Sequence, residues 1–167
     1  MSDFQKKVNA EPAQGLPGQL VDPSFVPTAL GYLSDGTLGP GDFAFTKSTE
    51  KGTAQVAYKK EGERLLGVVI RTATGMMNSP FMNAAETYAK GAPVAIAQRG
   101  RVYYKVSDGT PTIGQSLLVD PSTGAVTFGT AGTANDSGWV VVGFTNSATT
   151  AAKGDIVMIE NLGVNNK

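Results

Sequence analysis

Short apolar segments separated by turns run through most of this chain, and this pattern constrains the fold more than any other feature. From Gly31 onward, a turn containing glycine or proline recurs after roughly 8–12 residues. The 21 glycines and 9 prolines are spread along the chain, which is typical of many short strands and not of a helix bundle. The sequence therefore predicts an all-β fold, a small β-barrel or sandwich of about eight to ten short strands with an extended N-terminal arm.

The strongest strand signals lie in runs of alternating or continuous apolar residues. Asp42–Thr46 alternates Phe43 and Phe45 onto one face, and Leu65–Thr72 is nearly continuous, which predicts a central strand buried on both faces. Two further strands are predicted at Trp139–Thr145 and Asp155–Glu160, with Gly129–Ser137 as a loop before the first of them. The predicted core is Phe43, Phe45, Leu65, Val68, Ile70, Val94, Ile96, Val102, Tyr104, Leu118, Val126, Phe128, Val141, Ile156 and Met158.

Two hairpins are predicted from turn chemistry. Ala89–Val106 contains two alternating strands, and Gly100 between them can adopt the positive φ that a tight hairpin turn requires. Gln115–Val119 and Ala125–Phe128 flank Asp120–Gly124, a sequence rich in turn-forming residues.

The stretch 75–89 permits two interpretations. Ser79 before Pro80 could begin a short capped helix confined to 78–90. Alternatively, the stretch is an extended excursion whose Met and Phe side chains pack outward, and such residues when exposed usually indicate an interface. These residues are Met76, Met77, Phe81 and Met82.

Residues 1–27 differ from the rest of the chain because four prolines interrupt them and their apolar residues follow no period. They form either a disordered terminus or an arm that becomes ordered on a neighbouring subunit. The predicted division is an arm at 1–27, a β domain at 28–162 and a tail at 163–167. The apolar residues that would anchor the arm are Phe4, Val8, Leu16, Leu20, Val21 and Phe25.

A degenerate internal repeat is visible. In each copy a glycine opens a first strand, an apolar strand with an inner glycine follows, and Lys-Gly precedes a third strand. Because glycines at strand starts are common in β proteins, duplication and chance are both open. The copies are Gly41–Phe43, Gly67–Ala73 and Lys90–Val94, then Gly114–Ser116, Gly143–Ala148 and Lys153–Val157.

The composition argues against catalysis. Without cysteine or histidine, the chain has no disulfide, no thiolate metal ligand and none of the commonest general bases. The pair Glu61 and Glu63 is best interpreted as part of a solvated edge. Asp120, Asp136 and Asp155 lack the spacing of a calcium loop. We therefore expect no enzyme activity, no catalytic residue, no cofactor and no metal.

Charge and hydropathy limit the partners. The 14 basic and 14 acidic residues cancel, so no basic stripe indicates direct nucleic-acid binding. No run approaches the roughly 20 apolar residues of a membrane span, and the first residues lack a signal-peptide pattern, which predicts synthesis in a cytoplasm. A scaffold that acts by contact is the expected function. The alternative is a β-rich tail or fibre module that binds a receptor or carbohydrate.

Four stretches of the sequence carry a recognisable pattern: QKKVNAEPAQGLPGQLVDPS, PGDFAFT, LLGVVIRT and KGAPVAIAQRGRVYYKVSDGTPTIGQSLLVDPSTGAVTF. Over residues 1 to about 160, the chain thereby resembles the structural cement, or capsid decoration, proteins of tailed bacteriophages. The stretches 47–64 and 75–89 depart from the family pattern.

This resemblance implies a virion protein, made in the host cytoplasm, that sits on the outside of the capsid and cements neighbouring major capsid subunits. The arm anchors and the Met-rich residues named above would then contact the capsid or a neighbouring subunit. Because icosahedral shells present three-fold sites, a homotrimer is favoured over a dimer.

Overall fold

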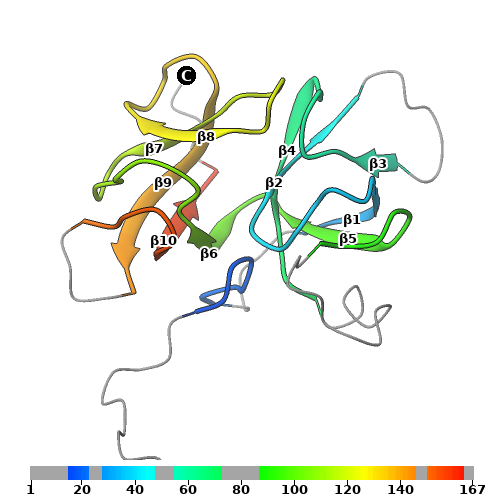
Figure 1. The fold of residues 1–167 in the computed structure, drawn as a ribbon, viewed down its shortest axis with the longest axis horizontal. Helices are drawn as coiled ribbons and strands as arrows, with labels where there is room; N and C mark the ends of the chain where they lie inside the picture. The colour runs from blue at the N-terminus through cyan, green and yellow to red at the C-terminus, as the bar shows by residue number, and fades with distance from the viewer. Residues whose placement is uncertain (1–14, 23–27, 48–54, 73–86, 146–149, 164–167) are drawn as a thin grey trace, which may run out of the picture.

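A computed structural model describes residues 15–22, 28–47, 55–72, 87–145 and 150–163. These residues form ten strands in two five-stranded sheets that lie side by side, and none of them is helical (Figure 1). The all-β prediction, including the expected number of strands, is therefore confirmed. No helix in the described part of the chain is long and apolar enough to span a bilayer.

The first sheet has the strand order β2-β4-β5-β1-β3 and the second has the order β6-β10-β9-β7-β8. The strands of the first sheet are β1 (Thr28–Ser34), β2 (Phe43–Thr46), β3 (Gln55–Ala57), β4 (Arg64–Val69) and β5 (Pro93–Ala97). Those of the second are β6 (Gly100–Lys105), β7 (Ser116–Val119), β8 (Val126–Gly129), β9 (Asp136–Phe144) and β10 (Ile156–Asn161).

The first sheet closes on itself. Phe45 in β2 and Tyr58, directly after β3, exchange two backbone hydrogen bonds of 2.8 and 2.9 Å, so the two ends of the sheet meet. The closed sheet surrounds a small apolar core, into which Tyr88 also packs, with its hydroxyl donating to the carbonyl of Ile70 (2.9 Å). The buried members of this barrel core are Leu38, Ala44, Ala57, Leu66, Val69, Tyr88, Ala92, Val94 and Ile96.

The outer face of β2, β4 and β5 packs against the second sheet and forms a larger shared core. Phe43 and Phe45 both lie in it, as their alternation predicted. β4 contributes to both cores, because Val68 faces the shared core while Leu66 and Val69 face the barrel core. The predicted burial of this strand on both faces is therefore confirmed.

The predicted hairpin at Ala89–Val106 is wrong. β5 pairs with β1 and β4 of the first sheet, whereas β6 pairs with β10 of the second, so the chain crosses between sheets at this point. Gly100 does have a positive φ of 106°. Period-two alternation identifies a strand but not its partner, and both edges of β5 are occupied by other strands. The second predicted hairpin is confirmed, because β7 pairs antiparallel with β8.

The register of two strands differs from the predicted core. Leu117 in β7 and Ile159 in β10 are fully buried, whereas Leu118 and Met158 are only half-buried. Both runs place apolar residues on each face, so alternation could not decide which face turns inward. The core also includes Trp139, which the prediction omitted and which is 1% exposed.

The two sheets share one order of pairing. In the first sheet β1 pairs with β5, β5 with β4 and β4 with β2, all antiparallel. In the second sheet β6 pairs with β10, β10 with β9 and β9 with β7, again all antiparallel. The strands of the sequence repeat therefore occupy equivalent places, which supports duplication. The third strand of each sheet in chain order is placed differently: β3 lies parallel to β1, whereas β8 lies antiparallel to β7.

Candidate functional site

One four-residue turn recurs at several strand entrances. The N–H of its fourth residue donates to the carbonyl of its first at 2.9–3.2 Å, and a glycine at the third position has φ between 74° and 97°. These are the features of a type II turn. The five turns are Leu16–Gln19, Gly39–Asp42, Ala89–Ala92, Thr112–Gln115 and Ala152–Asp155.

In four of these turns the fourth residue is Gln or Asp, and its side-chain oxygen accepts a bond of 2.8–3.0 Å from the N–H of the first residue. This second bond holds each turn closed. Two of the turns present large apolar side chains to solvent, since Leu16 is 52% and Ile113 is 61% exposed. The local signal was available in the sequence as PGQ, PGD, IGQ and KGD.

Part of the predicted arm lies against the β domain. Gly18 donates to the carbonyl of Tyr103 at 2.8 Å, Tyr103 donates to the carbonyl of Gln19 at 2.9 Å, and Val21 donates to that of Arg101 at 3.0 Å. Residues 18–21 therefore cover the free edge of β6. Among the predicted anchors, Leu20 packs against the shared core and Val21 is half-buried, so Leu16 alone of these three is well exposed.

The remaining predicted contact residues lie outside the described part of the chain. Most of the stretch 78–90, which was predicted to be either a helix or a loop, also lies outside it. These contact residues are Phe4, Val8, Phe25, Met76, Met77, Phe81 and Met82. The structure does show where their segments join the body.

The segments 1–14 and 73–86 join the body at neighbouring points. The backbone N–H of Arg71 donates to the carbonyl of Gly18 at 2.8 Å, and its Nε donates to the carbonyl of Pro17 at 3.3 Å. The N–H of Thr72 donates to the hydroxyl of Tyr88 at 3.3 Å. Sequence reasoning did not single out Arg71, because the residues it bonds lie more than fifty positions away.

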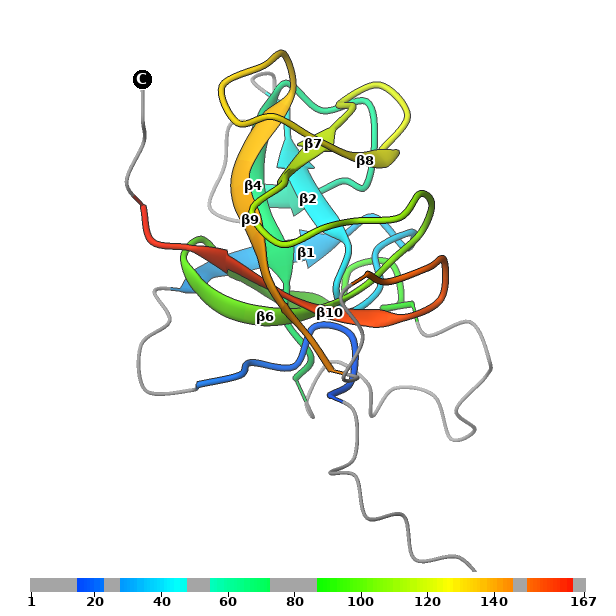
Figure 2. The ribbon, with the colours of Figure 1, turned by 90° about the vertical axis from the view of Figure 1, so that its left-hand side faces the viewer.

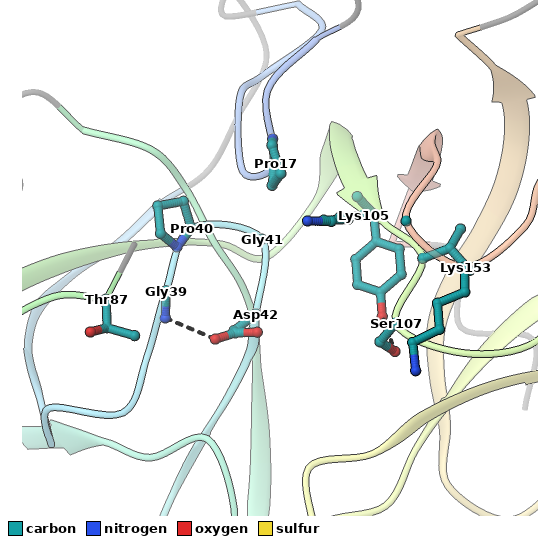
Figure 3. A pocket seen from close by; sticks show the side chains of 12 residues that line it. Pro17, Gly39, Pro40, Gly41, Asp42, Thr87, Lys105, Ser107 and Lys153 are labelled. Carbon is teal, nitrogen blue, oxygen red and sulfur yellow. Dashed lines mark hydrogen bonds between the residues drawn. The ribbon is translucent and has the colours of Figure 1, made fainter. Parts of the chain in front are cut away.

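A groove of about 480 Å³ opens beside these attachment points. Pro17 and Thr87 line it, so both segments join the body at its rim. Figure 3 shows Gly39, Pro40 and Asp42 on one side, with Lys105, Ser107 and Lys153 on the other.

Two polar side chains of this groove, Asp42 and Tyr104, are engaged in contacts within the protein. The Asp42 carboxylate accepts bonds from the N–H of Gly39 and the ammonium of Lys59, at 2.8 and 3.0 Å. Burial raises the pKa of Tyr104 to about 12, against a lowering hydrogen bond from Ser107, so this phenol is neutral at physiological pH.

The carboxylates of the three aspartates considered as calcium ligands accept hydrogen bonds from other groups of the protein. Asp120 caps its own turn, and bonds from Ser122 and Thr123 lower its pKa. For Asp136, burial by itself raises the pKa, but bonds from Gly132, Ser116 and Gly138 lower it overall. Asp155 closes its turn. Within the described ranges no three acidic residues are grouped so that they could hold a metal ion.

Comparisons with known proteins agree with this architecture. A family model described as "Structural cement protein (E217 gp24/Pam3 gp6)" matches residues 4–161. No curated protein matches the chain. Among solved structures, a chain from "The capsid of Myoviridae Phage XM1" has the same fold, with a TM-score of 0.59 and 11% identity over 96% of this chain and 99% of that one. The protein described here is thus a member of the phage structural cement protein family.

Proposed function

We propose that this protein is a non-enzymatic part of the virion that binds the outside of the capsid and joins neighbouring major capsid subunits. Family membership supports the structural role. The observation that carries the capsid contact is the joint attachment of the segments 1–14 and 73–86, which Arg71 ties to the Pro17–Gly18 turn. Two predicted contact segments thereby start from neighbouring points of the β domain.

A joint attachment favours strong binding because linked contacts reinforce each other. A single contact of micromolar affinity is worth about 8 kcal/mol. When one contact has formed, the second faces its site at an effective concentration near the millimolar range, so avidity exceeds either affinity by on the order of a hundredfold or more. The proposed contact residues are Phe4, Val8, Phe25 and the Met-rich residues, with Leu16 as the exposed anchor that the structure describes. Leu20 packs against the shared core instead.

The backbone of the attachment site leaves little room for adjustment. A Cβ added at Gly18 would lie 2.7 Å from the N of Gly41 and 2.8 Å from the carbonyl oxygen of Val69. The first of the recurring turns is therefore packed directly on the second and on β4. A rigid base of this kind lowers the entropy lost when the attached segments bind.

The test uses capsids that lack this protein and two variants of the full chain. One variant deletes residues 2–14 and stops there because residues 18–21 pair with β6. The other replaces residues 73–86 with a Gly/Ser linker of equal length. Both should melt like the parent, and each should bind capsids at least about tenfold more weakly.

If both variants bind capsids as tightly as the parent does, the capsid-binding surface lies on the β domain and the proposal is wrong. A parent that binds no capsid, but whose removal abolishes adsorption to host cells, would favour the tail or fibre alternative. In the described ranges the exposed large apolar side chains are Leu16, Ile113 and Leu162, none of them an aromatic platform for sugar.

We further propose that the protein acts as a homotrimer, since a three-fold unit matches the three-fold and quasi-three-fold sites of an icosahedral shell. Sedimentation or native mass spectrometry should give the mass of three chains or a multiple of it. A monomer at micromolar concentration would contradict self-association in free solution.

A further inference from the structure

The backbone edges of the two sheets are almost all occupied. The ends of the first sheet meet through Phe45 and Tyr58, and residues 18–21 cover β6. Among the described strands this leaves the outer edge of β8, which lies at the margin of the second sheet (Figure 2). An open edge is a template for strand addition unless charge or proline protects it. Ala125–Gly129 contains neither.

The backbone groups on this edge follow from the pairing with β7. Asp120 donates to the carbonyl of Ala125 at 2.9 Å, and hydrogen-bonded pairs recur at every second residue of an antiparallel ladder. Thr127 therefore bonds with Leu118, while the N–H and C=O groups of Val126 and Phe128 point away from β7. No hydrogen bond joins these outward groups to any described residue.

We propose that this edge pairs with β8 of a second copy of the chain, antiparallel about a two-fold axis through Thr127. In this register Val126 lies opposite the partner's Phe128, and Phe128 lies opposite the partner's Val126. The outward groups then form four hydrogen bonds and complete a continuous ten-stranded sheet.

The side chains suit the same register. Opposite residues of an antiparallel pair share a face, so Val126 meets Phe128 on the side of the shared core, where Phe128 is half-buried. Pairs of aromatic and β-branched residues are favourable across strands, and so is the Thr127 pair on the outer face. A two-fold contact requires that an edge be complementary to itself in its backbone groups and side chains. The three residues centred on Thr127 meet this condition.

The contact does not rest on capsid binding. Because it is two-fold, it adds to the proposed trimer and would join a copy in one trimer to a copy in the next.

The lack of natural cysteine allows a direct test with single cysteine variants. The two Thr127 residues would form a non-hydrogen-bonded pair with Cα atoms about 4.5 Å apart, within the range that a disulfide spans. The two Thr130 residues would lie on the order of 20 Å apart in the same register. Thr127→Cys should therefore give on the order of tenfold more covalent dimer than Thr130→Cys under mild oxidation, on a non-reducing denaturing gel.

Equal yields from the two variants, or no dimer from either, would overturn the proposal. A second measurement uses Thr127→Lys, which places two charges at the axis, with Thr130→Lys as its control. Thr127 is exposed, so both variants should melt like the parent. Thr127→Lys should weaken self-association on the order of tenfold. If it weakens only capsid binding, the shell occupies the edge and the proposal is wrong.

Discussion

The two sheets of this protein pair four of their strands in the same order, yet only the first is a closed unit. The first sheet surrounds its own core, and the reciprocal bonds of Phe45 and Tyr58 join its ends. The second sheet packs one face against the outer side of β2, β4 and β5. A similar order of pairing therefore gives one half that encloses a core of its own and one half whose core is shared with the other.

This difference explains where the open surfaces lie. A closed sheet has no free backbone edge, whereas an open sheet has two. In the second sheet one edge holds residues 18–21 and the other edge is β8. The attachment of the arm and the proposed contact between copies are thus both consequences of the open half.

The largest expected effect is at Gly67, in the strand that both cores share. Its φ is 142°, and an added Cβ would collide with the carbonyl oxygen of Ala97 in β5. Gly67→Ala should cost about 3 kcal/mol or more in the free energy of unfolding. Gly91→Ala is the control, because Gly91 also has a positive φ but open space around it, and should cost about 1 kcal/mol. Equal costs in denaturant titrations would contradict the close packing of β4 on β5.

A core truncation tests whether the second half depends on the first. Leu117 is fully buried in the shared core, so Leu117→Ala should cost about 3 kcal/mol. The neighbouring Leu118→Ala should cost about 1 kcal/mol or less, because this side chain is half-exposed. Both variants should unfold in one transition. If the second sheet unfolded in a separate, earlier transition, the two halves would not form one cooperative unit.

Asp136 gives the second sheet a dependence on pH. Its carboxylate accepts bonds from the Ser116 hydroxyl and from the N–H groups of Gly132 and Gly138. Because these bonds lower its pKa below 3.8, its stabilising effect is present above that value and is lost as pH falls further.

Asp136→Asn should therefore cost about 1–2 kcal/mol at neutral pH. The difference from the parent should shrink below about pH 4. Melting curves at several pH values measure it. A difference that stays constant down to pH 2 would show that the charge of Asp136 is unimportant.

The smallest expected effect is at the β6–β10 pair. Arg101 Nε lies 2.6 Å from Glu160 Oε1, but the arginine side chain is 53% exposed. Arg101→Ala should cost about 0.5 kcal/mol, and 1 M salt should remove most of this difference. A double-mutant cycle with Glu160→Gln isolates the ion pair. A coupling above about 2 kcal/mol would mean that this part of the second sheet is less exposed to solvent than the structure shows.

Local chemistry explains what could be predicted of the fold. The β7–β8 hairpin is specified by Asp120 and the turn residues after it, which lie next to the strands they join. The double burial of β4 follows from its continuous apolar run. The crossing from β5 to β6 could not be predicted, since the same alternation suits a hairpin and a change of sheet.

The candidate site also combines features that the sequence indicates with features that depend on contacts between distant residues. Leu16, Leu20 and Val21 were identified from their apolar character in a proline-rich stretch, but their different exposures depend on β6. The bonds from Arg71 to Pro17 and Gly18 join residues distant in the chain, and no local pattern indicates them.

By itself, the sequence determined most of the segments that become strands and several of the turns, because alternation, β-branched residues and positive-φ glycines act over a few neighbouring residues. Only the tertiary structure decided which strands pair, which face of β7 turns inward and which sheet closes. Every strand offers the same backbone donors and acceptors, so its partner is chosen by how well distant side chains pack when the two sheets meet.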